Sequence, residues 1–347
     1  MTTNPIYITI RHIADILNRQ DNQHLLRKRF QESAVDWDHG VIIASQYLML
    51  PALYCELKRK DLLSDIPSDL KLYLEEITSI NRNRNKSLLK EADEISALFN
   101  QAQIDFVFIK GTVMLANLAT EDIGARMVGD IDVVVHPDHI QQAYKLLQAH
   151  GYTDTIDFNY ETKNFRHLPR QLNPNKIGAI ELHSEVLIYQ YKKLINIMEL
   201  LKNKQTIRNL NVPSHEDSIK IAIYTTQIND HAHLFGHLNL KTIYDCLILD
   251  LYKKQHLLTN LSQRSYSNSF LELSSLYFPE LKPINEKRYS KALKYYYKFK
   301  LINPKLGRLT YQSIYYFQQI SKRLKLFLNN KSYRAHIFKN IIEFKKH

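Results

Sequence analysis

Apolar residues recur every three or four positions through most of the chain, a spacing that predicts amphipathic helices. Near the centre, short runs rich in Val, Ile and Phe replace this spacing and predict strands. The pattern therefore predicts an α+β protein with a small mixed β-sheet between helical flanks. The predicted helices cover residues 10–17, 24–33, 41–58, 70–80, 88–99, 137–149, 217–228, 241–252 and 269–276, and the predicted strands cover 105–110, 130–135, 153–158, 164–168 and 177–186.

The same pattern suggests three regions. We expect an N-terminal helical region at 1–84, an α/β core at 85–190 and a C-terminal helical region at 191–347. Within the last region, residues 282–347 form a basic tail rich in aromatic residues.

Two carboxylates open the strand predicted at 130–135. Successive side chains of a strand point to opposite faces, so Asp130 and Asp132 should share one face with their Cα atoms about 6–7 Å apart. Two like charges so placed repel each other unless a cation or a proton neutralises one of them. This pair therefore predicts a site for a hard divalent cation.

A second motif precedes this pair. The strand at 105–110 runs into Gly111 and Thr112, and a helix is expected to begin there. Glycine allows close approach of the backbone, and the free N–H groups at a helix N-terminus attract anions. Together with the acidic pair, this turn predicts a cradle for a nucleoside triphosphate.

The string from Phe108 to Asp132 resembles an uncharacterised bacterial family of the polymerase-beta-like nucleotidyltransferase superfamily. The resemblance rests on a Lys110-Gly111 turn, on Arg126 shortly before the acidic pair, and on Gly151-Tyr152 after the next helix. It covers about residues 85–190 and implies a nucleotidyltransferase core.

The resemblance also implies further site residues. The superfamily needs a third carboxylate on a later strand, and Glu181 occupies that place as a metal ligand or general base. A solvent-facing glutamate is the alternative. His183, two positions on, either orients substrate or is a partly buried histidine bonded to a backbone carbonyl. His231, Lys241 and Asp245 fit a His-helix-Lys-Asp pattern of the family and are candidates for facing the substrate.

The resulting hypothesis is Mg²⁺- or Mn²⁺-dependent transfer of NMP from an NTP to a hydroxyl of RNA, protein or a small molecule. Asp130, Asp132 and Glu181 would be the catalytic residues and metal ligands, and Lys110, Gly111, Thr112 and Arg126 would bind the nucleotide. Lys110 equally suits a charge that caps the strand end. A phosphotransferase, a tRNA-modifying toxin and an inactive scaffold are the alternatives.

Charge is distributed unevenly. The chain has a net charge of +12, and residues 282–347 hold 17 Lys and Arg against Glu286 and Glu343. All the excess basicity therefore lies in the tail, which suits RNA, an anionic membrane face or an acidic carrier. The alternative is a helical pair whose apolar residues pack inward, because these residues follow helical spacing. They are Tyr311, Ile314, Tyr315, Ile320, Leu324 and Phe327.

The remaining composition narrows the class of protein. Cys55 and Cys246 provide neither a disulfide framework nor metal-ligand spacing. His231, His233 and His237 are closely spaced, but without accompanying cysteines they suggest solvated loop residues more than a zinc site. The first residues lack a signal-peptide pattern, and no apolar run is long enough to span a bilayer. We therefore expect a cytoplasmic protein.

Overall fold

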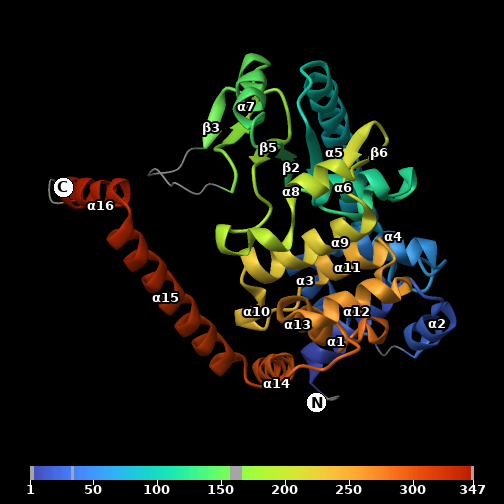
Figure 1. Ribbon diagram of the computed structural model, residues 1–347. Helices are drawn as coiled ribbons and strands as arrows, with labels where there is room; N and C mark the ends of the chain where they lie inside the picture. The colour runs from blue at the N-terminus through green and yellow to red at the C-terminus, as the bar shows by residue number, and fades with distance from the viewer. Residues whose placement is uncertain (1–3, 33–34, 157–165, 345–347) are drawn as a thin grey trace.

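The computed structural model describes residues 4–32, 35–156 and 166–344. It confirms the predicted α+β class, since a small mixed sheet lies among helices from both ends of the chain. Figure 1 shows the sheet on one side of a helical body, with the C-terminal helices extending away from that body.

The N-terminal region consists of five helices. The prediction of one helix over 41–58 is wrong, because the chain turns at Leu48, with φ 58°, and forms two helices there. Pro51 lies in the first turn of the second helix, where the backbone N–H that proline lacks would have no partner within the helix. In the middle of one continuous helix, the same proline would remove a hydrogen bond and interrupt the helix. The helices are α1 (Pro5–Leu17), α2 (Gln23–Gln31), α3 (Trp37–Gln46), α4 (Leu50–Arg59) and α5 (Ser68–Gln101).

The long helix α5 joins the N-terminal region to the sheet. Its 34 residues include both helices predicted at 70–80 and 88–99. Its first half packs on α4, and its last turns contribute Ile95 and Phe99 to the core beneath the sheet. The division proposed at residue 84 therefore falls within one continuous helix.

The central sheet has five strands in the order β1-β2-β5-β4-β3. Only β2 and β5 pair in parallel, and the other neighbours are antiparallel. The predicted strands at 153–158 and 164–168 lie partly outside the described residues. The core elements are β1 (Phe106–Ile109), α6 (Gly111–Asn117), the 3-10 helix η1 (Thr120–Ala125), β2 (Asp130–Val135), α7 (Ile140–Ala149), β3 (Asp154–Ile156), β4 (Arg170–Leu172) and β5 (Ala179–His183).

The two faces of the sheet pack against different cores. Phe108 and Val133 belong to a cluster shared with α5 and α7, whereas Ile109 and Val134 join the large core of the helical body. Strand alternation puts Asp132 on the same face as Val134. The acidic residues therefore lie on the face that meets the helical body.

Helices dominate the C-terminal region, as predicted. Its elements are η2 (Tyr189–Leu194), α8 (Ile197–Lys202), the hairpin β6 (Gln205–Ile207) and β7 (Leu210–Val212), α9 (His215–Tyr224), the π-helix η3 (Thr225–Asn229), α10 (Ala232–Phe235), α11 (Leu240–Ile248), η4 (Leu251–Lys253), α12 (Gln255–Gln263), α13 (Ser265–Ser274), η5 (Pro279–Leu281), α14 (Arg288–Ile302), α15 (Pro304–Asn329) and α16 (Lys331–Phe344).

The basic tail is helical, but the inward packing considered for it is wrong over most of α15. Ile320 and Leu324 are 65% and 57% exposed. Among the described residues, the ring contact between α15 and the body is that of Tyr311, 4.6 Å from Phe235. No helix in the described parts of the chain is long and apolar enough to cross a membrane.

Candidate active site

The parallel pairing of β2 with β5 brings the acidic residues together. Asp132 is directly opposite Glu181 in the register, and Asp130 is opposite Ala179. Residues opposite each other in a sheet point to the same face, so the two carboxylates are neighbours. Asp132 and Glu181 are buried, at 6% and 8% exposure, while Asp130 lies at the more open end of the strand.

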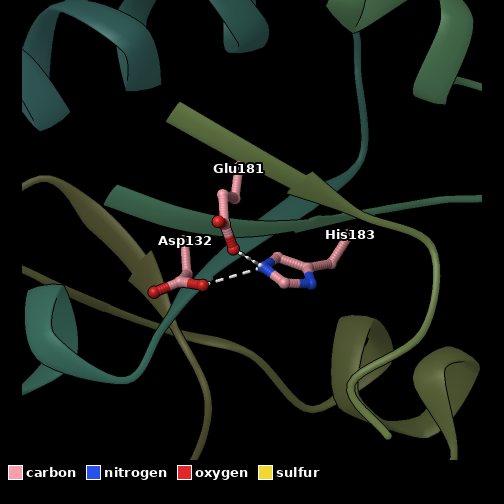
Figure 2. Close-up of side chains that lie close together, drawn as sticks. All are labelled: Asp132, Glu181 and His183. Atoms are coloured by element: carbon pink, nitrogen blue, oxygen red, sulfur yellow. Dashed lines mark hydrogen bonds and ion pairs between the residues drawn. The ribbon is translucent and has the colours of Figure 1, made fainter. Parts of the chain in front are cut away.

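His183 holds the two buried carboxylates (Figure 2). Its Nε2 atom lies 2.8 Å from Oδ1 of Asp132 and 3.5 Å from Oε2 of Glu181. Since carboxylates accept hydrogen bonds, Nε2 carries the proton and donates it. The opposite ring nitrogen, Nδ1, is buried and has no hydrogen-bond partner among the described residues. The sequence left open that His183 bonds to a backbone carbonyl. This interpretation is wrong, because the partners of His183 are the two carboxylates.

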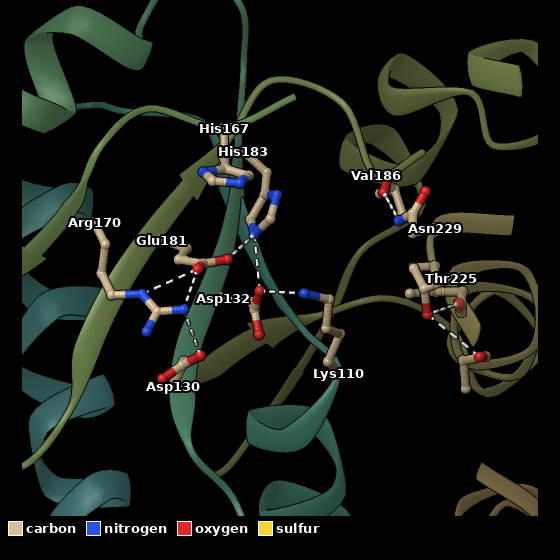
Figure 3. Close-up of polar contacts among 12 residues, drawn as sticks. Lys110, Asp130, Asp132, His167, Arg170, Glu181, His183, Val186, Thr225 and Asn229 are labelled. Carbon is tan, nitrogen blue, oxygen red and sulfur yellow. Dashed lines mark hydrogen bonds and ion pairs between the residues drawn. The ribbon is translucent and has the colours of Figure 1, made fainter. Parts of the chain in front are cut away.

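Two cations flank the carboxylates (Figure 3). Lys110 forms an ion pair with Asp132. Arg170 of β4 bridges the other two carboxylates, with Nη2 3.0 Å from Oδ2 of Asp130 and 2.5 Å from Oε1 of Glu181. Sequence reasoning missed Arg170, because nothing in the local pattern around β4 distinguishes it.

These contacts shift the carboxyl pKa values in different directions. The hydrogen bond from His183 lowers the pKa of Glu181, and Arg170 lowers it further against the effect of burial. Burial raises the pKa of Asp132, but Lys110 and His183 outweigh it and the net shift is downward. The pKa of Asp130 is raised by burial, which Arg170 offsets only in part. The two buried carboxylates are therefore held ionised.

The turn between β1 and α6 brings the backbone close to these groups. Lys110 adopts the positive φ of 56°, which directs the chain from the strand into the helix. A Cβ atom on Gly111 would lie 2.7 Å from Cγ1 of Val128, so the close packing requires glycine. Thr112, predicted to cradle phosphate, is 2% exposed. The backbone of Gly111 reaches the adjacent cavity, while the Thr112 side chain is buried.

Arg126, predicted to contact phosphate, is instead paired with Asp245 of α11. Its Nε and Nη2 atoms lie 2.7 and 2.9 Å from the two carboxylate oxygens, and both side chains are buried. Its Nη1 atom donates to the carbonyl of Met127. The guanidinium is therefore committed to a structural contact that ties the segment before β2 to the C-terminal helices.

Two cavities meet beside the acidic cluster. The larger, of about 510 Å³, is lined by Asp130, Asp132, Gly111 and the 126–129 segment. The smaller, of about 200 Å³, is lined by the π-helix η3, by Asp230 and by Arg166. Both are bordered by the same three cationic residues, Lys110, Arg126 and Lys241.

The smaller cavity has a polar lining. Asp230 is exposed at the border of this cavity, and partial desolvation raises its pKa although Lys110, Arg166 and Lys241 oppose the shift. Burial lowers the pKa of Lys241, and the neighbouring charge of Arg126 lowers it further. A π-helix is rare and often marks a functional site. Sequence reasoning found Lys241 through the resemblance but missed Arg166, Asp230 and the π-helix.

The candidate histidines lie apart from the acidic cluster. His233 donates a hydrogen bond from Nδ1 to the carbonyl of Gln227, and His231 is the N-cap residue of α10, in the left-handed region at φ 56°. In the described parts of the chain, the residues close enough to hold one metal ion are Asp132, Glu181 and His183, whose ligand atoms lie within 4.8 Å of one another. His231, His233 and His237 do not form such a group.

Comparison with known proteins agrees with this geometry. No curated protein and no solved structure gives a significant match to the chain. A family model described as "Uncharacterised nucleotidyltransferase" matches residues 33–259. This match covers more than half of the chain and includes the acidic cluster, both cavities and the Arg126–Asp245 pair. The chain therefore belongs to this uncharacterised nucleotidyltransferase family.

Proposed function

We propose that the protein transfers NMP from an NTP to a hydroxyl group, with Mg²⁺ or Mn²⁺ held by the carboxylates of β2 and β5. One observation carries the proposal: Asp130, Asp132 and Glu181 share one face of the sheet beside a cavity of about 510 Å³. The membership of the chain in a nucleotidyltransferase family supports the reaction class.

The donor set fits a hard divalent cation. Three carboxylates face two cationic side chains, Lys110 and Arg170, so the carboxylates outnumber the Lys and Arg residues paired with them by one. Carboxylate oxygens are the ligands that Mg²⁺ and Mn²⁺ prefer. When bound, such an ion would neutralise charge that develops on the transferred phosphoryl group.

Other residues of the site would position the carboxylates and contact the nucleotide. His183 and Arg170 hold Asp132 and Glu181 in position through hydrogen bonds and ion pairs. A carboxylate whose pKa is lowered is a weak base, so Glu181 is better suited to binding a cation than to removing a proton. Lys110 and Gly111 border the larger cavity, where the lysine side chain and the glycine backbone would contact the phosphates of the nucleotide.

The smaller cavity would receive the acceptor. It opens beside Lys110, on the side of the helical body, and its lining includes Thr225, Asn229 and Asn239. These uncharged polar groups suit an acceptor that carries hydroxyls. Lys241 and Asp245 of the predicted substrate-facing set line this cavity, whereas His231 lies next to Asp230 at its border.

Labelled nucleotides separate this proposal from phosphoryl transfer, which could use the same carboxylates. The protein is incubated with Mg²⁺ and an NTP labelled at the α- or the γ-phosphate, together with total RNA or hydroxylated small molecules. We expect label in the acceptor only from the α position. Transfer only from the γ position would refute nucleotidyl transfer and identify a phosphotransferase.

A further inference from the structure

Helix α15 stands apart from the rest of the molecule. In Figure 1 it runs away from the helical body for most of its length, with α16 at its far end. Of its 26 residues only Gly307 is buried. The helix contacts the body near its start, where the ring of Tyr311 lies against Phe235. The family match ends at residue 259, so this helix is additional to the nucleotidyltransferase domain.

An apolar stripe runs along the side of α15 that points away from this contact. At about 100° per residue, six exposed apolar residues fall within an arc of about 100°, together with the partly buried Phe327. Tyr311 and Tyr315 lie on the opposite side of the helix. All six are more than half exposed, from 51% at Leu306 to 76% at Phe317. The six are Leu306, Leu309, Phe317, Ile320, Leu324 and Leu328.

The charged residues of α15 are all basic. The helix contains five Lys and Arg residues and no Asp or Glu. Lys305 and Arg323 lie about a quarter turn from the stripe on one side, and Lys325 lies somewhat further round on the other. The preceding helix, α14, adds five more Lys and Arg residues and again no carboxylate. The apolar stripe therefore has positive charge beside it near both of its ends.

The apolar stripe and the cations of α15 together fit one kind of partner best. A second copy of α15 would bring its cations against like charges, with no carboxylate on either helix to pair with them. Single-stranded RNA would suit the cations and the tyrosines, but Leu and Ile side chains offer bases no ring to stack on. Anionic lipid satisfies both features, because acyl chains accept the apolar stripe and headgroups accept Lys and Arg.

We propose that α15 is a membrane-surface anchor that lies in the headgroup region of an anionic lipid bilayer. Its apolar stripe would enter the boundary with the acyl chains, and its flanking cations would remain at the headgroups. The helix would lie on the bilayer and not cross it, which agrees with the absence of a membrane-spanning helix among the described residues. The site in the nucleotidyltransferase domain would then act next to a lipid surface.

Vesicle flotation tests this proposal with the full-length protein. We expect the wild type to float with vesicles that contain phosphatidylglycerol and to remain unbound with pure phosphatidylcholine. Replacing Phe317, Ile320 and Leu324 with Ser should lower the partition coefficient at least about tenfold, because three exposed side chains lose their contact with lipid. All three are exposed, so the variant should fold, as circular dichroism would confirm.

A matched control removes as much exposed apolar surface elsewhere. Leu25, Leu72 and Ile80 are 56%, 66% and 62% exposed on α2 and α5, and their replacement with Ser should leave flotation unchanged. The proposal is overturned if the wild type does not float with anionic vesicles, or if the α15 variant floats as well as the wild type. Binding of wild type to single-stranded RNA without flotation would identify the tail as an RNA-binding surface instead. NTP turnover, measured separately, tests the proposed enzymatic function independently of these results.

Discussion

Arg126 and Asp245 lie 119 residues apart in the chain and form a buried, two-pronged ion pair. The pair joins the segment before β2 to helix α11 at the wall that the two cavities share. The sheet and the C-terminal helices are thus fixed relative to each other at the candidate site. Both residues lie within the segment that the family model matches, residues 33–259.

Replacing Arg126 with Ala should destabilise the fold by about 3 kcal/mol, because a buried carboxylate then loses its partner. Urea denaturation at neutral pH measures this change. The double variant Arg126→Ala, Asp245→Ala should lose less stability than the two single variants together. Additive losses would show that the two side chains do not interact, and would contradict the pairing.

Gly111→Ala should destabilise the protein by about 1–3 kcal/mol, because the added Cβ would overlap the side chain of Val128. The variant Val128→Ala removes that side chain and serves as the compensating change. We expect thermal unfolding of the double variant to lie closer to wild type than that of Gly111→Ala. If Val128→Ala gives no relief, the packing of the turn is not as described.

Asp130→Asn and Asp132→Asn should both abolish nucleotide transfer but differ in stability. Asp132 is buried and bonds to Lys110 and His183, so its amide variant leaves both with a weaker partner and costs about 1–3 kcal/mol. Asp130 is more open and has a raised pKa, so its variant should change the unfolding free energy by less than about 1 kcal/mol. Equal losses of stability would contradict the difference in environment.

The sequence predicts the site residues that lie close together on one strand. Asp130 and Asp132 lie on one β-branched strand, and alternation alone predicts that they share a face. Glu181 required the resemblance to a family, since only the parallel pairing of β2 with β5 puts it opposite Asp132. Arg170 could not be predicted, because its role depends on β4 pairing with β5.

Other expectations failed because distant residues decide them. The position of Arg126 in the motif predicts a contact with phosphate, but its guanidinium forms an ion pair with Asp245, on a helix far away in the sequence. Thr112 was expected at the N-terminus of a helix, facing phosphate, but the helix begins at Gly111 and the side chain of Thr112 is buried. The helical spacing of α15 predicted a helix correctly, but spacing alone does not show whether another element covers the apolar side.

Acid should weaken the fold through Glu181 and Asp132. Their pKa values are lower in the folded protein than in the unfolded chain, so the unfolded chain binds more protons as the pH falls. The stabilisation is fully present above the unfolded pKa values, near pH 4, and is lost below them. Glu181→Gln should therefore show a shallower loss of stability than wild type between about pH 5 and pH 3, measured by urea denaturation. Parallel pH profiles would contradict the lowered pKa of Glu181.

The central claim is that the carboxylates of β2 and β5 transfer a nucleotide, and the rate of transfer from an α-labelled NTP tests it most directly. With Mg²⁺ and an acceptor, we expect label to reach the acceptor with wild type and the rate to fall by at least about a thousandfold with Asp132→Asn. Leu72→Ser, an exposed substitution on α5, should transfer at the wild-type rate. Full Mg²⁺-dependent transfer by Asp132→Asn would contradict the assignment of the site.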